Sequence, residues 1–172
     1  NQNKADDNNL TKFVDPFIGS GGHGHVFVGA NVPFGVVQVG PSNFYKGWDW
    51  SSSYHHTDSI VKGFTHLNLS GTGMTDLSDF IVMPAVGKRK IWAGNQDHPN
   101  DAFASLYSKE TEVAKPGYYS VQLDDYNIKA ELTASERVGK HRYTFTKAKQ
   151  ARVIIDSTEC NTHITVDTNK KQ

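Results

Sequence analysis

The chain has 172 residues, with 18 basic and 18 acidic side chains, and therefore no formal net charge. This length suffices for one domain with its own core, and the balanced charge lacks the surplus of Lys and Arg that a nucleic-acid surface needs. The longest apolar run, Phe80–Gly87, is far shorter than the ~20 residues of a membrane span. We therefore expect a single domain with no nucleic-acid partner and no transmembrane segment.

A polar segment opens the chain. Residues 1–11 are rich in Asn, Asp and Lys, so we expect a flexible leader there, and residues 12–172 are expected to form one β-sandwich domain. No signal peptide is present, although a polar start is compatible with a mature exported protein. Cys160 is the only cysteine, which excludes an intrachain disulfide and a zinc site built from several thiolates.

The region from about residue 13 to residue 79 is rich in Gly, His, Ser and aromatic residues and shows no sustained helical period. Two short apolar runs, His25–Val28 and Phe34–Val39, look like buried strands separated by Gly-bearing turns. We therefore predict strands at both runs.

After about Tyr107 the sequence changes to short strands with polar breaks. The alternation from Asn127 onward places Ile128 and Leu132 on one face and Lys129 on the other. We expect strands at 118–123, 127–135, 140–146, 151–158 and 163–167, with turns at Pro116-Gly117 and Asp124-Asp125. This spacing predicts an all-β fold, an antiparallel β-sandwich of the super-sandwich type. Because the chain stops soon after a strand, we expect the sandwich to be incomplete at its C-terminal end, as in a piece of a longer protein.

Two histidines, His23 and His25, stand between glycines. Glycine allows the backbone to approach a ligand or another loop closely, and two imidazoles one residue apart share a face if the segment is extended. A metal pair is imaginable, but no third ligand follows at a recognisable spacing. Hydrogen bonding of these histidines to neighbouring loops is the simpler interpretation, and we expect no metal ligands in this chain.

The segment Gly47–Asp58 combines Trp48, Asp49 and Trp50 with a Tyr-His-His sequence. A sugar ring has apolar faces and a polar rim, so a site for it needs a flat aromatic side chain and groups such as Asp or His for the hydroxyls. If the segment is extended, both indoles share one face. The alternative is that both tryptophans belong to the core.

Two further segments carry polar residues. His66 lies in a short apolar run, and the Ser-Gly-Thr-Gly turn that follows could aim backbone N–H groups at a ligand or simply close a hairpin. Arg137, His141 and Arg142 lie on or beside a predicted strand, and a solvated strand face is the favoured interpretation for all three.

Together these blocks resemble the opening blocks of glycoside hydrolase family 92, the α-mannosidase family. The resemblance rests on VDPFIGSGGHGHVFVGANVPFG, GWDW followed by YHHTDS, GFTHLNLSGTG, PGYYSV and ELTASERVGKHRYTF, in that order, over roughly Phe13 to Asp156. The departures are modest: Ser51 stands where relatives more often have Cys.

The resemblance implies a secreted, periplasmic or cell-surface bacterial enzyme that cleaves α-mannosidic linkages from the chain end, with inversion and with calcium. In the family the acid, the base and the calcium ligands belong to an (α/α)6 domain that follows the sandwich, so no catalytic residue is assigned in this chain. This domain is expected to supply one wall of the pocket for an α-mannoside glycan. The residues expected to line that wall are Trp48, Asp49, Trp50, His23, His25 and His66.

Two other hypotheses compete with this one. A free-standing carbohydrate-binding sandwich would use its tryptophans as a surface platform, without a second domain. A small metalloenzyme would use His23, His25 and His66 as ligands, and the spacing favours it least.

Overall fold

The computed structural model describes residues 9–74, 80–95, 97, 101–146 and 149–157. Regular structure in these residues consists of antiparallel strands and short 3₁₀ helices, which confirms the all-β prediction. No helix in the described ranges is long and apolar enough to cross a membrane. The 3₁₀ helices are η1 (Leu10–Phe13), η2 (Trp48–Trp50) and η3 (Lys109–Thr111).

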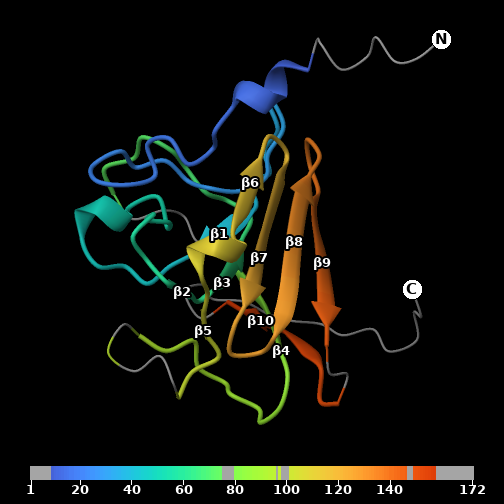
Figure 1. The fold of residues 1–172 in the computed structure, drawn as a ribbon. Helices are drawn as coiled ribbons and strands as arrows, with labels where there is room; N and C mark the ends of the chain where they lie inside the picture. The colour runs from blue at the N-terminus through green and yellow to red at the C-terminus, as the bar shows by residue number, and fades with distance from the viewer. Residues whose placement is uncertain (1–8, 75–79, 96, 98–100, 147–148, 158–172) are drawn as a thin grey trace, which may run out of the picture.

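Two four-stranded antiparallel sheets form the sandwich, and Figure 1 shows one in front of the other. The rear sheet has the order β1-β3-β4-β10, with β1 (Gly40–Ser42), β3 (Gly63–Thr65), β4 (Ile81–Ala85) and β10 (Arg152–Asp156). The front sheet follows chain order, with β6 (Val113–Lys115), β7 (Tyr118–Leu123), β8 (Ile128–Ala134) and β9 (Gly139–Phe145). A separate pair joins β2 (Ile60–Val61) to β5 (Ser105–Leu106).

Strands β7, β8, β9 and β10 match the sequence prediction closely, whereas β6 was not predicted. Ile128, Ala130 and Leu132 of β8 are buried against the rear sheet, while Lys129 faces outward, as the alternation predicts. Both predicted turns, at residues 116–117 and 124–125, occur. The fifth predicted strand, residues 163–167, and residues 1–8 of the predicted leader lie outside the described residues.

The prediction of strands at His25–Val28 and Phe34–Val39 was wrong. In this region an isolated bridge joins Val39, at the end of the second run, to Ala30, which lies beyond the first run. Positive φ angles of 50° at His25 and 60° at Phe34 take the backbone out of the extended conformation, and Phe34 is fully exposed. The backbone at Gly40 instead passes close to the backbone at Val28. A Cβ added to Gly40 would lie only 2.4 Å from the Val28 carbonyl oxygen, so this close approach requires glycine.

A buried polar network joins the front sheet to the loop that follows η2. The Glu112 carboxylate accepts hydrogen bonds from Tyr119 Oη of β7 at 2.6 Å and from Tyr54 Oη at 3.0 Å. Lys109 Nζ contacts the same carboxylate at 3.1 Å, and burial lowers the pKa of Lys109 while Glu112 opposes that shift. Because Tyr54 follows η2, the network holds this loop in place against the sheet.

A pair of histidines lies on the inner face of β9. His141 Nε2 is 2.9 Å from His66 Nε2, and His141 Nδ1 is 2.6 Å from the Tyr143 hydroxyl. Burial, and secondarily the charge of His66, lowers the pKa of His141 to about 4. Only Arg137 and Arg142 fit the predicted solvated face, and Arg142 pairs there with Glu131 at 2.7 Å. His141 points the other way.

The close approach of Gly40 to Val28 generates a stability prediction. We expect Gly40→Ala to lower the free energy of unfolding by about 1–3 kcal/mol, since the new methyl group must push backbone atoms of Val28 aside. Urea denaturation measures this change. The matched control is Gly21→Ala, whose Cβ would meet its nearest neighbour at 3.6 Å, an ordinary contact. Equal effects of the two substitutions would contradict the steric account.

The histidine pair generates a pH prediction. The folded-state pKa of His141, about 4, lies below the ordinary histidine value of 6.5. Between these values the unfolded chain binds a proton that the folded chain rejects, so stability falls as the pH drops from 6.5 towards 4. We expect His141→Gln to flatten this part of the urea-denaturation profile, because glutamine has no proton to gain in this range. Parallel profiles for wild type and His141→Gln would rule the assignment out.

Candidate functional site

Three loops from different parts of the chain meet: residues 17–27, 47–58 and 70–73. Backbone hydrogen bonds join them, from Gly71 N–H to the His25 carbonyl at 2.7 Å and from His56 N–H to the Ser20 carbonyl at 2.8 Å. Phe27 N–H donates to Ser70 Oγ at 3.2 Å. The Ser-Gly-Thr-Gly turn therefore holds the histidine segment instead of leaving its groups open.

Glycine makes the tightest part of this assembly possible. A Cβ added to Gly24, between the two histidines, would lie 2.0 Å from the Gly19 carbonyl oxygen. No other residue type fits there without moving the backbone. The expectation that these glycines permit close approach of one loop segment to another is confirmed.

Four side chains gather on this assembly, and we call them the indole–imidazole cluster: His23, His25, Trp48 and Asp49. The His25 ring meets the Trp48 ring edge-on with centroids 4.0 Å apart, and the His23 ring lies 5.6 Å from the same indole. His23 Nδ1 is 2.5 Å from Asp49 Oδ1. Trp48 remains 55% exposed and His23 is exposed too, so the cluster presents an open aromatic surface with a carboxylate at its edge.

His25 is the buried member of the cluster. Its Nδ1 is 2.7 Å from the Thr72 carbonyl oxygen, and because a carbonyl can only accept, Nδ1 carries the proton. Its Nε2 is buried without a hydrogen-bond partner among the described residues and lies 3.8 Å from Asp49 Oδ1. His25 therefore supports Trp48 from within and faces the carboxylate with its second nitrogen.

The two tryptophans do not share a face. Trp48, Asp49 and Trp50 form the 3₁₀ helix η2 and are not extended, so neighbours two positions apart point in different directions. The Trp50 indole N–H donates to Asp58 at 2.9 Å, and its ring stacks on His55 with centroids 4.2 Å apart. Trp50 is therefore engaged in holding the loop, whereas Trp48 is open.

His66 lies apart from the cluster. Its ring stacks on Phe80 with centroids 4.7 Å apart and pairs with His141 on β9. The three histidines of the metalloenzyme hypothesis are thus not brought together as one ligand set. Within the described ranges no group of three or more His, Cys, Asp or Glu side chains could hold a metal ion.

Sequence reasoning missed some of the supporting residues. Ser51 is buried beneath the cluster, donates to the Trp48 carbonyl and lies 3.5 Å from His25 Nδ1. Asp58 is buried and binds both Trp50 and Lys46, the latter at 2.9 Å. The sequence offered Asp58 as a polar group near the tryptophans, but Asp49 stands equally near, so the pattern did not tell which acid would accept the indole N–H.

Comparisons with known proteins agree with this architecture. The model of the glycosyl hydrolase family 92 N-terminal domain matches residues 13–172. The family GH92 alpha-mannosidase BT3965 from Bacteroides thetaiotaomicron, solved in complex with mannoimidazole, is 39% identical, covers 86% of this chain and superposes with a TM-score of 0.82. The inverting mannosidase BT2199 from the same organism, at 24% identity over 84% of the chain and a TM-score of 0.69, supports the fold alone.

A curated relative, an uncharacterized secreted glycosidase from Arthroderma benhamiae, is 28% identical over 79% of this chain. The chain spans only 17% of that relative's length and about 20% of the solved mannosidases. The family resemblance expected from the motif order is confirmed, and the chain belongs to glycosyl hydrolase family 92, whose N-terminal domain it matches from residue 13 to residue 172.

Proposed function

We propose that this chain is the N-terminal domain of a secreted, inverting, calcium-dependent exo-α-mannosidase and forms one wall of its substrate pocket. Its bacterial periplasmic or cell-surface location is part of the same proposal. The acid, the base and the calcium ligands then lie on the (α/α)6 domain of the longer polypeptide. The mannosidase names of the solved relatives and the family membership support the substrate class.

The observation that carries the proposal is the open face of Trp48. An exposed indole offers the flat apolar surface on which the C–H groups of a sugar ring can stack. Asp49 and His23 stand beside it and supply an acceptor and a donor for hydroxyl groups. Trp48, and not Trp50, is the stacking residue in this proposal, and we place it on the leaving-group side of the scissile bond.

The carboxylates of the loop assembly fit a supporting role better than a catalytic one. Inversion requires an acid and a base about 6.5–9.5 Å apart, with room for a water molecule beside the sugar. Asp49 is bound by His23, and Asp58 is buried and bound by Trp50 and Lys46. Both acids thus hold loop structure, which is why we assign the catalytic pair to the remainder of the polypeptide.

Calcium binding does not fit the described residues either. Calcium takes six to eight oxygen ligands, usually including several carboxylates. The described part of the chain offers no group of three acidic or histidine side chains for a metal, and Asp49 shares its site with imidazoles. In this proposal the calcium ligands therefore belong to the remainder of the polypeptide.

A second function, a free-standing carbohydrate-binding domain, is favoured by the same exposed indole. The two functions differ in whether Trp48 alone suffices for binding. In the mannosidase proposal the opposite wall comes from another domain, so the isolated chain should bind a mannoside at Trp48 only weakly.

The division of labour predicts that the purified 172-residue chain does not hydrolyse 4-nitrophenyl α-mannoside or α-linked mannobiose, with or without calcium, because it lacks the acid and the base. Release of nitrophenol or mannose measures this. The encoded full-length polypeptide, assayed in parallel, should release mannose. Turnover by the 172-residue chain alone would overturn the assignment of catalysis to the missing part.

The role of Trp48 predicts a substrate-dependent defect in the full-length polypeptide. Trp48→Ala should lower kcat/KM for α-linked mannobiose about ten-fold, equivalent to about 1.4 kcal/mol of lost stacking. α-Mannosyl fluoride has no sugar in its leaving group, so its hydrolysis should be nearly unchanged. Phe13→Ala, at another exposed aromatic residue, serves as the control. An equal loss on both substrates would show that Trp48 acts elsewhere.

A further inference from the structure

A hollow of about 280 Å³ lies between the outer side of the rear sheet and the segment that follows β4. Tyr45 and Trp92 stand at its wall, Phe44 and Ile81 line it with apolar surface, and Lys62 and Asp156 add charged groups. None of these residues belongs to the indole–imidazole cluster. We call it the Trp92 pocket.

The two aromatic side chains of the pocket are open. Trp92 is 47% exposed and Tyr45 is 56% exposed, whereas Phe44 and Ile81 are buried. Two flat rings, each with a polar end, thus flank an apolar base, and this is an arrangement suited to an amphipathic ligand.

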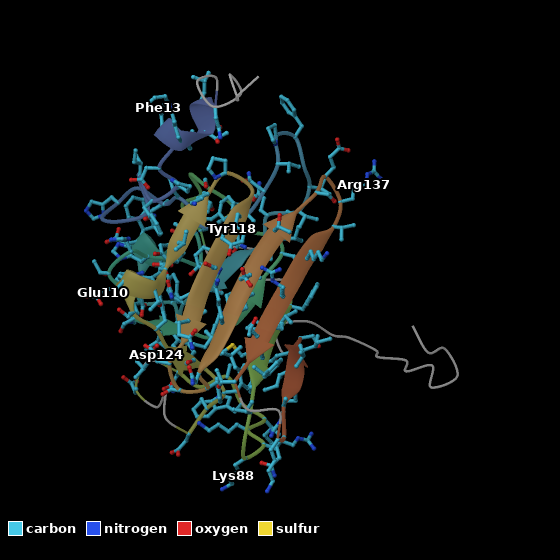
Figure 2. The ribbon with its side chains drawn as sticks, turned by 45° about the vertical axis from the view of Figure 1, so that its right-hand side comes forward. Phe13, Lys88, Glu110, Tyr118, Asp124 and Arg137 are labelled. Carbon is cyan, nitrogen blue, oxygen red and sulfur yellow. The ribbon has the colours of Figure 1, made fainter. Side chains whose placement is uncertain are left out.

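The backbone that carries Trp92 is held in place. Phe103 N–H donates to the Trp92 carbonyl at 2.9 Å, and Ala104 N–H donates to the Ala93 carbonyl at 3.3 Å. A wall fixed by such bonds loses less conformational entropy on binding than a free loop does. Figure 2 shows Lys88, four residues before Trp92 in the sequence, at the end of the molecule opposite Phe13 of η1.

The chemistry and size of the pocket suit one sugar ring. The aromatic faces match the C–H faces of a hexopyranose. Lys62 and Asp156, which both already interact with other groups, add polar atoms to the rim beside the rings. The volume lies just below the range of about 300–1,000 Å³ typical of drug-sized ligands. A neighbouring hollow of about 330 Å³ shares Ile91 and Asp156 and brings Arg89 and Arg152, so a longer glycan can continue beyond the first ring.

We propose that the Trp92 pocket is a second, non-catalytic binding site for a hexopyranose of a glycan chain, independent of Trp48. That the sugar is a mannoside rests on the function proposed above; the site itself does not. Such a site would retain a polymeric or branched glycan on the enzyme while the chain end is processed elsewhere.

The test uses the isotopically labelled 172-residue chain, whose three tryptophans each give one indole N–H resonance. Trp48→Phe, Trp50→Phe and Trp92→Phe assign the three signals. Titration with an α-linked mannotriose should shift the Trp92 signal along a saturable curve. Trp92→Ala removes this signal, so the affinity of every variant is fitted from the backbone amide shifts of Tyr45 and Ile81, which line the same pocket. Trp92→Ala should weaken that affinity about ten-fold, Tyr45→Phe less, and Trp48→Ala should leave it unchanged.

Sorbitol, which has sugar-like hydroxyls but no ring, is the control titrant. A Trp92 signal that does not shift, or that shifts equally with sorbitol, overturns the proposal. If Trp92→Ala does not fold, Tyr45→Ala tests the same wall, and unchanged affinity there is equally damaging. The Trp48 signal tests the other site separately. If the Trp92 signal shifts and saturates while the Trp48 signal does not shift, the second site is supported and a free-standing sugar platform at Trp48 is ruled out.

Discussion

The close approach of the glycine-rich loop to itself around Gly24 is the constraint on which the candidate site depends. A Cβ at Gly24 would lie only 2.0 Å from the Gly19 carbonyl oxygen, so the loop can fold back on itself only because this residue is glycine. The fold-back places His23 and His25 in different environments. His25 turns inward to the Thr72 carbonyl, and His23 turns outward to Asp49. Although only Gly24 separates them in the sequence, His25 is a buried, supporting imidazole and His23 is an exposed one.

Buried polar contacts help to hold the loop assembly together. Ser51, His55 and Asp58 are all buried there, and each makes hydrogen bonds to a neighbouring loop or side chain. A buried polar group of this kind costs about 1–3 kcal/mol when it is unpaired. Loop conformations that leave these groups without partners are therefore less stable than the observed one. The Glu112 network anchors the same loop to β7, which gives the site a rigid connection to the front sheet.

The strands of the front sheet could be predicted from the sequence because period-2 alternation and turn residues act locally. YYSVQL coincides with β7, and the turn at Asp124-Asp125 leads into β8 as expected. The N-terminal half could not be predicted in this way. Its apolar runs are buried at points such as Val28 and Val39. However, positive φ angles and close backbone approaches at glycine, both set by tertiary contacts, prevent these runs from pairing as regular strands. His141 was misassigned, although its alternation with Tyr143 and Phe145 placed it on the inward face.

Motif reasoning could group four residues of the site: His23, His25, Trp48 and Asp49. It could not tell which of the two tryptophans stays open and which one holds the loop. Which indole stays open depends on which one finds a buried acceptor, and only Trp50 has Asp58 within reach. Trp48 instead meets the His25 ring edge-on, and among the described residues no carboxylate accepts from its N–H. An exposed indole held by a buried histidine is already immobilised before any ligand arrives. Pre-organisation of this kind reduces the entropy lost on binding, which is the physical reason to expect Trp48, and not Trp50, to meet the sugar.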